Sequence, residues 1–223
     1  QNGILFIHTK NIRKLLSEIS FKIFNRIPKN LIAVTGTNGK SSIADFYYQI
    51  LKLNNKRVAS IGTLGVKSNS FNLDLSNTTI DPIQLGMILK KLKHQRIDNV
   101  IMEASSHGLK QNRLDGLKFN SGIFTNLSQD HLDYHKNLND YLNAKLYLFR
   151  NLIKKKGNII TDDKIPEFRA INKIAKKKRL KIITLNDKKN DFSILSHTFK
   201  GEIQLLKIKY NNSIKEINLN LIG

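Results

Sequence analysis

The sequence of 223 residues contains no cysteine. It can therefore form no disulfide and no thiolate metal site, and it has no cysteine nucleophile. It also lacks any apolar run near the roughly 18 to 20 residues that a membrane-spanning helix requires, and its N-terminus has no signal-peptide pattern. These absences predict a soluble, cytoplasmic protein without a membrane partner.

Acidic residues are scarce, because 17 Asp and Glu stand against 38 Lys and Arg and give a formal net charge of +21. Such a charge attracts polyanions, so nucleic-acid binding has to be considered. Only eight of the basic residues are Arg, the better reader of bases and phosphates, and no aromatic residues are interleaved with the lysines. We interpret clusters such as Lys154–Lys156 and Lys176–Lys178 as solvated surface and expect no nucleic-acid partner.

Hydrophobic residues make up 40% of the chain, which is enough to fill the core of a protein of this length. The sequence has no internal repeat and no long linker rich in glycine, serine or proline, so we expect one domain with a small appendage. The chain begins at Gln1 and stops at Gly223, directly after an apolar segment. We interpret it as a fragment of a longer protein.

Short apolar runs alternate with helical patterns along most of the chain. The run Leu31–Val34 is typical of a strand buried in a parallel sheet, and a glycine loop and a helical pattern follow it. Asp81 and Pro82 suit the N-cap and the first position of a later helix. Strands separated by helices imply an α/β fold with a mainly parallel, P-loop-type sheet flanked by helices. The expected strands are 31–34, 57–61, 99–102, 122–125, 158–161 and 181–185, and the expected helices are 11–24, 40–53, 82–95, 138–152 and 165–177.

The pattern changes near the C-terminus. Residues 203–210 and 214–221 have the composition of two strands, and Asn211, Asn212 and Ser213 between them favour a turn. We expect a hairpin or small antiparallel β appendage attached to the main sheet.

A glycine loop follows the first buried strand. Gly36 and Gly39 let the backbone turn tightly and aim N–H groups inward, and the positive end of the next helix adds to them. Lys40 can reach the β- and γ-phosphates of a nucleotide, and the Ser41 hydroxyl can bind Mg²⁺. The common P-loop has four residues between its glycines and this loop has two, so an ordinary strand-to-helix turn is the alternative. We predict a phosphate site made by Gly36, Thr37, Asn38, Gly39, Lys40, Ser41 and Ser42.

A second polar cluster, Met102–Leu109, follows the expected strand 99–102. Ligands of open parallel sheets bind beyond the carboxyl ends of the strands, where the glycine loop also lies. We therefore expect Glu103 to approach a Mg²⁺ ion held near Ser41. The alternatives are a hydrogen-bonded acid at a strand end and, for His107, a helix cap.

A third cluster, Thr125–His135, follows the expected strand 122–125. Asp130, His131 and Asp133 are residue types that contact metals or phosphates, although no zinc spacing is complete. Asp and His also form ordinary loops and caps, so spacing alone leaves both readings open.

Together, three motifs resemble those of the Mur ligases and folylpolyglutamate synthases, which join amino acids to carboxylates. The first is Thr35–Ser41, which resembles their ATP loop; the others are Met102–Leu109 with Arg113, and Thr125–His135. The last two look like one branch, which adds the third residue of the peptidoglycan stem peptide to UDP-MurNAc-L-Ala-D-Glu. The match runs from about residue 31 to 152, with the motifs in order.

The resemblance implies a catalytic set of Lys40, Glu103, His131 and Lys145. Lys40 and the loop amides would hold the phosphates of ATP, and Ser41 and Glu103 would bind one Mg²⁺ ion. His131 would serve a second Mg²⁺ ion. Lys145 falls where the family has a carbamylated lysine, whose anionic oxygen suits Mg²⁺ as an ammonium group does not. Without the resemblance, Lys145 would be interpreted as a solvated charge on a helix.

The resemblance also implies substrate contacts. Asn77, Thr78 and Thr79 resemble the segment that contacts the UDP-linked substrate in the family, together with residues that match Ser105 and Arg113. Arg113 suits a bidentate grip on a carboxylate, which lysine would hold less specifically.

The implied reaction begins when the D-Glu carboxylate attacks the γ-phosphorus of ATP to give an acyl phosphate. The incoming amine then displaces phosphate. The implied partners are UDP-MurNAc-L-Ala-D-Glu and an amino acid, with meso-diaminopimelate favoured over lysine, and the cofactors are ATP and Mg²⁺. We expect a monomer.

The same resemblance predicts the domain organisation. Residues 1–28 would be the end of an N-terminal UDP-binding domain with its linker. Residues 29–223 would be a central ATP-binding domain that is incomplete at its C-terminus, with a C-terminal domain absent. Such a fragment is expected to be inactive alone.

Three alternatives remain. Another ligase of the superfamily, of the folylpolyglutamate synthase or cyanophycin synthetase kind, would share the ATP loop but not the second and third motifs. A GTPase-like module would need four residues between the loop glycines. A basic nucleic-acid-binding domain would bind DNA or RNA in a salt-sensitive way that survives replacement of Lys40.

Overall fold

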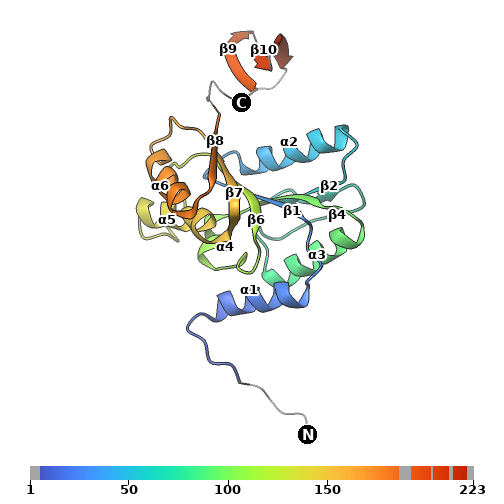
Figure 1. The fold of residues 1–223 in the computed structure, drawn as a ribbon, viewed down its shortest axis with the longest axis vertical. Coiled ribbons are helices and arrows are strands. Elements are labelled where there is room, and N and C mark those ends of the chain that lie inside the picture. Colours follow the sequence, from blue (N-terminus) through green and yellow to red (C-terminus); the bar gives the residue numbers. More distant parts are fainter. Residues whose placement is uncertain (1–5, 186–191, 202, 211–212, 220–223) are drawn as a thin grey trace.

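The computed structural model describes residues 6–185, 192–201, 203–210 and 213–219, which form two sheets and the helices around the larger one (Figure 1). The larger sheet has eight strands in the order β4-β3-β2-β5-β1-β6-β7-β8. Its strands are β1 (Asn30–Thr35), β2 (Val58–Gly62), β3 (Gly65–Ser68), β4 (Asn72–Leu73), β5 (Asn99–Glu103), β6 (Phe119–Phe124), β7 (Ile153–Thr161) and β8 (Lys181–Thr184). The helices are α1 (Ile12–Ile23), α2 (Lys40–Leu53), α3 (Pro82–His94), α4 (Ser106–Lys110), α5 (Leu138–Tyr147) with the π-helical turn η1 (Leu148–Leu152), and α6 (Phe168–Lys178).

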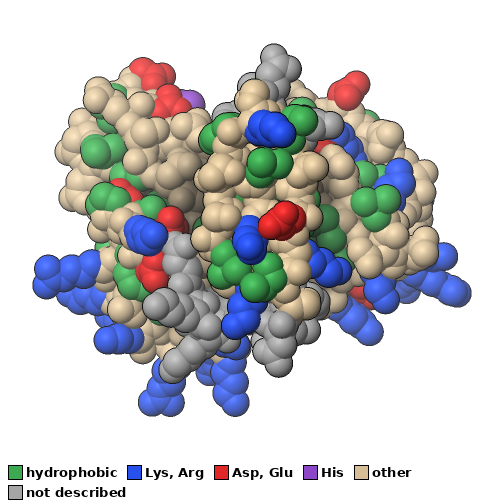
Figure 2. Space-filling view, turned by 90° about the horizontal axis from the view of Figure 1, so that it is seen from above, with side chains coloured by type: hydrophobic (Ala, Val, Ile, Leu, Met, Phe, Trp, Pro, Cys, Tyr) green, Lys and Arg blue, Asp and Glu red, His purple; other side chains and the backbone are tan. Residues whose placement is uncertain are grey.

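The second sheet consists of β9 (Phe192–Lys200), β10 (Ile203–Tyr210) and β11 (Ser213–Leu219), all antiparallel. It lies beyond the end of β8, away from the N-terminal residues (Figure 1). Large hydrophobic side chains of this sheet are exposed, Phe199 among them. Figure 2 views the molecule from this end and shows hydrophobic side chains at the surface, with lysine and arginine side chains projecting from the edges.

Six strands of the larger sheet are parallel, and their register aligns the loops that follow them. Val34 of β1 pairs with Glu103 of β5, and Thr35 pairs with Phe124 of β6. The carboxyl ends of these three strands therefore lie in a row at one edge. This alignment brings together the glycine loop and both polar clusters.

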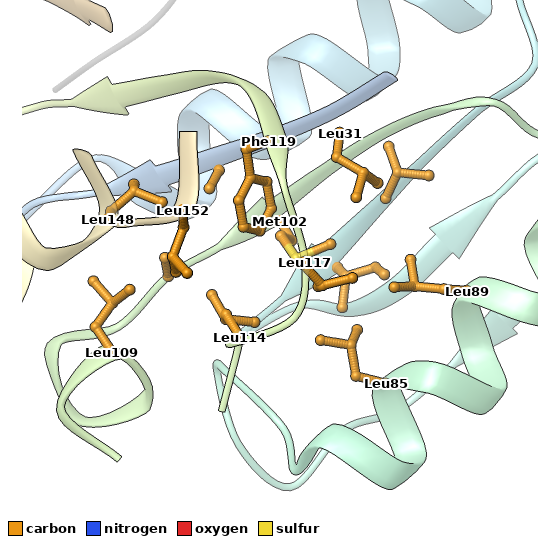
Figure 3. Close-up of a cluster of buried hydrophobic side chains, with 14 of the residues drawn as sticks. Leu31, Leu85, Leu89, Met102, Leu109, Leu114, Leu117, Phe119, Leu148 and Leu152 are labelled. Atoms are coloured by element: carbon orange, nitrogen blue, oxygen red, sulfur yellow. The ribbon is translucent and has the colours of Figure 1, made fainter. Parts of the chain in front are cut away.

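The two faces of β1 pack against different helices. Successive side chains of a strand point to opposite faces, so Leu31 and Ala33 join the larger core whereas Val34 packs with Ala44 of α2. The larger core includes the buried side of α3, where Leu85, Ile88, Leu89 and Leu92 recur at helical spacing (Figure 3).

The mainly parallel α/β sheet flanked by helices is confirmed, as is the N-cap at Asp81, whose Oδ1 accepts hydrogen bonds from Ile83 and Gln84. No described helix is both long and apolar enough to cross a membrane. Helix α5 was expected to continue to Leu152, but its last turn is π-helical.

Several expectations were incomplete or wrong. The short strands β3 and β4 and helix α4 were not predicted, because two to five residues carry no resolvable period. Strand β7 starts at Ile153, earlier than expected. The C-terminal appendage has a third strand, β9, and its described residues pair with one another in a sheet separate from the main one. Asn211, Asn212 and the predicted strand end at 220–221 lie outside the described residues.

Replacement of Leu89 by alanine tests the core of the larger sheet. Leu89 is 0% exposed, so we expect Leu89→Ala to lower the free energy of unfolding by about 2 to 5 kcal/mol. Met87 lies on the same helix and is 56% exposed, so Met87→Ala should change it by less than about 0.5 kcal/mol. Urea denaturation measures both, and equal effects would contradict this packing.

Candidate functional site

The glycine loop depends on two backbone positions that exclude side chains or favour glycine. Gly36 has φ +149°, and a Cβ there would lie 1.8 Å from Oγ1 of Thr125. Gly39 has φ +83°, in the left-handed region, and is the N-cap of α2 without any side-chain capping bond. The first turn of α2 thus presents its positive end to the loop without a capping side chain.

The glycine loop is tied to the loop after β6. The amides of Thr37 and Asn38 donate to the main-chain and side-chain oxygens of Asn126, at 2.9 and 3.0 Å. In return, Thr125 Oγ1 donates to the carbonyl of Asn38 at 2.7 Å. The first and third motifs therefore form one structural unit, in which some loop amides already have protein acceptors.

Two lysines share one carbonyl oxygen inside this unit. Lys40 Nζ donates to the carbonyl oxygens of Gly36 and Thr37 at 3.0 and 2.7 Å. Lys145 Nζ donates to the same Gly36 oxygen at 2.7 Å and lies 4.1 Å from the centre of the Tyr141 ring. Lys145 is 1% exposed, so its ammonium group is held away from water.

Burial has the largest effect on the charge of both lysines. Burial, followed by repulsion from Lys40, lowers the pKa of Lys145 from 10.5 to about 7. Burial also lowers the pKa of Lys40, and attraction by Glu103 and Asp130 opposes that effect. A positive charge at this position is costly until an anion approaches it.

Glu103 lies at the other side of the glycine loop, with a carboxylate that is buried. Its Oε2 accepts from Ser41 Oγ at 3.0 Å, and its Oε1 accepts from the Thr63 amide at 2.9 Å. A Cβ on Gly62 would lie 2.1 Å from Oε1, so only glycine leaves room for the carboxylate. The expected approach of Glu103 to Ser41 is present in the structure.

His131 lies among aromatic rings, one of which contacts Lys145. Its ring centroid is 4.9 Å from that of His107 and 6.0 Å from that of Tyr141, whose ring also contacts Lys145. Its Nε2 is 3.5 Å from Oδ2 of Asp130, and its backbone is left-handed, with φ +52°. Tyr141 thus links His131 to the buried lysine, whereas Glu103 contacts Ser41.

The neighbouring histidines carry little positive charge. Burial, and next the charge of His131, lowers the pKa of His107 below its ordinary value of 6.5. Burial also lowers the pKa of His135, which hydrogen-bonds through Nε2 to Ser106 Oγ at 3.0 Å. Both shifts favour the neutral form of these two histidines.

The donor set at Ser41 and Glu103 fits Mg²⁺. Among the described residues, no group of three or more His, Asp or Glu side chains could hold a metal ion without other ligands. Mg²⁺, however, commonly binds through one or two carboxylates together with water and substrate phosphates. A buried carboxylate beside a hydroxyl supplies oxygen donors of that kind.

The expected substrate contacts Asn77, Thr78 and Thr79 differ in accessibility. Asn77 is exposed, Thr78 is half-buried and Thr79 is buried. The Thr79 hydroxyl donates to the carbonyl of Glu103 and accepts from the Ser105 amide, both at 2.9 Å. Thr79 therefore holds this loop against the end of β5.

Ser105 directly precedes α4, and Arg113 follows it by three residues. Ser105 caps this helix by accepting from the Gly108 amide at 3.1 Å. Arg113 donates through Nη1 to the carbonyl of Thr79 and through Nε to Gln111 at 3.0 Å. The second motif thus brings its guanidinium beside the loop that contains Thr79.

Asn112 fixes the turn that precedes Arg113. Its φ is +58°, and its side chain accepts from Asn11 at 3.0 Å and donates to the Tyr147 hydroxyl at 3.1 Å. Its carbonyl accepts from Ser17 Oγ at 2.6 Å. Helix α1 and the end of α5 therefore both hold the position of Arg113.

Thr63 and Tyr141 were missed by the sequence analysis. The Thr63 amide donates to Glu103, and the Thr63 hydroxyl forms a hydrogen bond with the hydroxyl of Thr78. Thr63 lies in the turn before β3, a strand that was not predicted. Its position after an apolar strand was the available signal. Tyr141 lies 3.3 Å from Thr37 Oγ1, and nothing in a helical pattern distinguishes it from a core tyrosine.

The candidate site encloses very little volume. The hollow beside Ser41 and Glu103 measures only about 10 Å³, whereas another between η1, β7 and α6 measures about 680 Å³. A ligand as large as a nucleotide would stay largely exposed here without cover from another part of a protein.

The sequence profile described as the Mur ligase middle domain matches residues 34–223. The chain is 39% identical over 223 residues to the protein of Rickettsia montanensis named UDP-N-acetylmuramoyl-L-alanyl-D-glutamate–2,6-diaminopimelate ligase, covering 97% of this chain and 46% of that protein. The protein of the same name from Zymomonas mobilis subsp. mobilis is 34% identical over 221 residues, with coverage of 99% and 46%. The chain thus spans about half the length of these relatives.

Solved structures show the same relationship. A structure of a ligase of that name matches with a TM-score of 0.83 at 28% identity, and the match covers 97% of this chain and 45% of the other. Folylpolyglutamate synthetase from Lactobacillus casei matches with a TM-score of 0.68 at 12% identity, with coverage of 98% and 59%, and so shares the fold.

Replacement of Asn112 by glycine tests the anchoring of the Arg113 turn. Glycine keeps the left-handed backbone but removes the side-chain bonds, so Asn112→Gly should lower the free energy of unfolding by about 1 to 3 kcal/mol. Asn55 has nearly the same φ, +56°, and is exposed, so Asn55→Gly is the matched control and should change stability by less than about 0.5 kcal/mol. Thermal or urea unfolding distinguishes the two variants. An unchanged free energy of unfolding in Asn112→Gly would refute the anchoring role.

Proposed function

Since the chain belongs to the Mur ligase family, we propose that it is the ATP-binding middle part of a ligase that adds an amino acid to UDP-MurNAc-L-Ala-D-Glu. We propose meso-diaminopimelate as the added residue, because the relatives at 34 to 39% identity are named for it. The observation that carries the proposal is the convergence of Lys40, Lys145 and Glu103 where β1, β5 and β6 end.

The proposed nucleotide site is the glycine loop with the start of α2. The uncapped first turn of α2 offers amides and a positive helix end to phosphates, and Lys40 Nζ lies within the same loop. Approach of the γ-phosphate would replace the carbonyl contacts of Lys40 with a stronger, charge-assisted one. The anionic ligand would thereby offset the desolvation of both lysines.

Two groups of residues would hold Mg²⁺. Ser41 and Glu103 supply oxygen donors at the first, and His131 with Lys145 would form the second. A lysine ammonium cannot bind a cation, so the second set fits only if Lys145 carries a carbamate, as in the resembling family. When bound, Mg²⁺ neutralises phosphate charge in the transition state.

The chain's own residues would serve the substrate carboxylate. A carboxylate that attacks the γ-phosphorus of ATP meets electrostatic repulsion, which Lys40 reduces. Arg113 would hold a carboxylate of the UDP-linked substrate, beside Asn77 and Thr78, and Ser105 lies at the same loop. Because α1 and α5 anchor the neighbouring Asn112, and the guanidinium donates to Thr79 and Gln111, Arg113 would be oriented before substrate binds.

The same proposal extends to the whole protein. Residues 1–28 would end a UDP-binding domain and residues 29–223 would be the central domain. The hollow of about 10 Å³ beside Ser41 and Glu103 cannot enclose a nucleotide, so another domain would have to cover it, which agrees with this division. The relatives of about twice this length also support it.

Loss of nucleotide binding in Lys40→Ala is the direct test of the proposed site. Binding at about 100 times the dissociation constant stabilises a protein by about 2.7 kcal/mol, so Mg-ATP should raise the melting temperature of the unmodified protein measurably. Lys40→Ala should abolish this rise, whereas Lys52→Ala, at the exposed end of the same helix, should keep it. If Lys40→Ala shows the full rise, the glycine loop does not hold the nucleotide.

The lowered pKa of Lys145 predicts a pH-dependent carbamate. CO₂ adds to the neutral amine and releases a proton, and with a pKa of about 7 the amine becomes mainly neutral above neutral pH. The carbamate at Lys145 should therefore increase between pH 6 and pH 8, as measured by ¹³C NMR with labelled bicarbonate. Lys145→Ala should lack this signal and lose affinity for the second Mg²⁺ ion, which short carboxylic acids should partly restore. A signal that persists in Lys145→Ala would assign the carbamate to another amine.

A further inference from the structure

Two lysine clusters that are distant in the sequence meet in one groove. A hollow of about 680 Å³ lies between the π-helical turn η1, the start of β7 and the end of α6, and a neighbouring hollow of about 440 Å³ shares part of its lining. The start of β7 is at the edge of the sheet opposite to the candidate site. We call this hollow the basic groove; its lining includes Lys118, Arg150, Lys154, Lys155, Lys156, Lys177, Lys178 and Arg179.

The basic groove has no acidic residue in its lining, nor has the neighbouring hollow. Within the described part of the chain, none of its eight cations lies in an ion pair with a carboxylate. Lys118, Arg150 and Lys154 instead donate to neutral oxygens of asparagine residues, at 2.7, 3.0 and 3.0 Å. The positive charge of the groove is therefore uncompensated by the protein.

Stabilisation of a helix end explains only part of this arrangement. Lys177 and Lys178 lie in the last turn of α6, where cations interact favourably with the helix dipole. Lys155 and Lys156 belong to a strand, and Lys118 precedes another one. No helix dipole therefore explains why these three residues line the same hollow. Like charges gathered around a concavity repel one another and favour an anion that lies between them.

The shape and composition of the groove indicate what kind of anion fits. Its volume is within the range of small-molecule sites, and a concave lining suits a compact ligand better than a flat membrane surface. Its one aromatic residue, Phe149, is buried, so no ring is available for stacking nucleic-acid bases. We propose that the basic groove binds a compact, soluble ligand with several phosphate groups.

The test uses inorganic triphosphate, which has no base or sugar. Because the glycine loop also attracts phosphate, binding is measured by calorimetry on a protein that carries Lys40→Ala. We expect binding that weakens with salt, and a further triple change of Lys155, Lys177 and Lys178 to glutamine should reduce the affinity about tenfold or more. A change of Lys22, Lys56 and Lys90 to glutamine removes the same charge from other exposed positions and should alter the affinity less than about twofold.

Other outcomes would overturn the proposal. Equal weakening by the two triple variants would mean that net charge alone attracts the anion. Absence of binding in the Lys40→Ala protein would assign all phosphate binding to the glycine loop. Binding of single-stranded DNA, or of vesicles containing phosphatidylglycerol, that triphosphate does not displace would replace the compact ligand with a polymer or a membrane. The proposed ligase function predicts none of these results, so its failure would leave this test unaffected.

Discussion

Strand β1 hydrogen-bonds to β5 on one side and to β6 on the other, in a register that sets Val34 beside Glu103 and Thr35 beside Phe124. In this register the three strands end at nearly the same level of the sheet, so the loops that follow them lie side by side. The contact of Gly36 with Thr125 and the bonds from Asn126 to the glycine loop follow from this register. The lysine contacts also depend on this register, because it fixes the position of the Gly36 carbonyl, which accepts a hydrogen bond from Lys145 of α5.

The electrostatics of this edge differ from those of an ordinary folded surface. Lys40 and Lys145 are brought onto one oxygen atom although each repels the other and burial disfavours both charges. The buried Glu103 carboxylate is equally constrained, between Ser41, Thr63 and the bare backbone of Gly62. Arrangements of this kind cost stability in a protein that binds nothing, and they are typical of sites where a charged ligand or a modification supplies the missing partner.

Much of the fold could be predicted from the sequence, because buried parallel strands and amphipathic helices have strong local signals. The short strands β3 and β4, helix α4 and the strand β9 had no such signal. The expected proximity of Glu103 to Ser41 relied on topology: the two residues follow different strands, and the parallel sheet brings them together. Thr63 and Tyr141 take part through contacts with residues far away in the sequence. The lysine clusters at 154–156 and 176–178 were interpreted as solvated surface, and residues of both line one groove. Such contacts depend on side-chain packing, which no local pattern records.

One border of the larger sheet has a further consequence. Strand β4 comprises only Asn72 and Leu73, both exposed, and it runs antiparallel to β3. Unpaired strand borders invite sheet extension between molecules, and natural proteins limit this hazard with short, polar or twisted terminal strands. Here another chain that approached β4 would find a backbone too brief for a continuous ladder. The short strand β4 thus limits edge-to-edge aggregation at the border of the sheet that it forms.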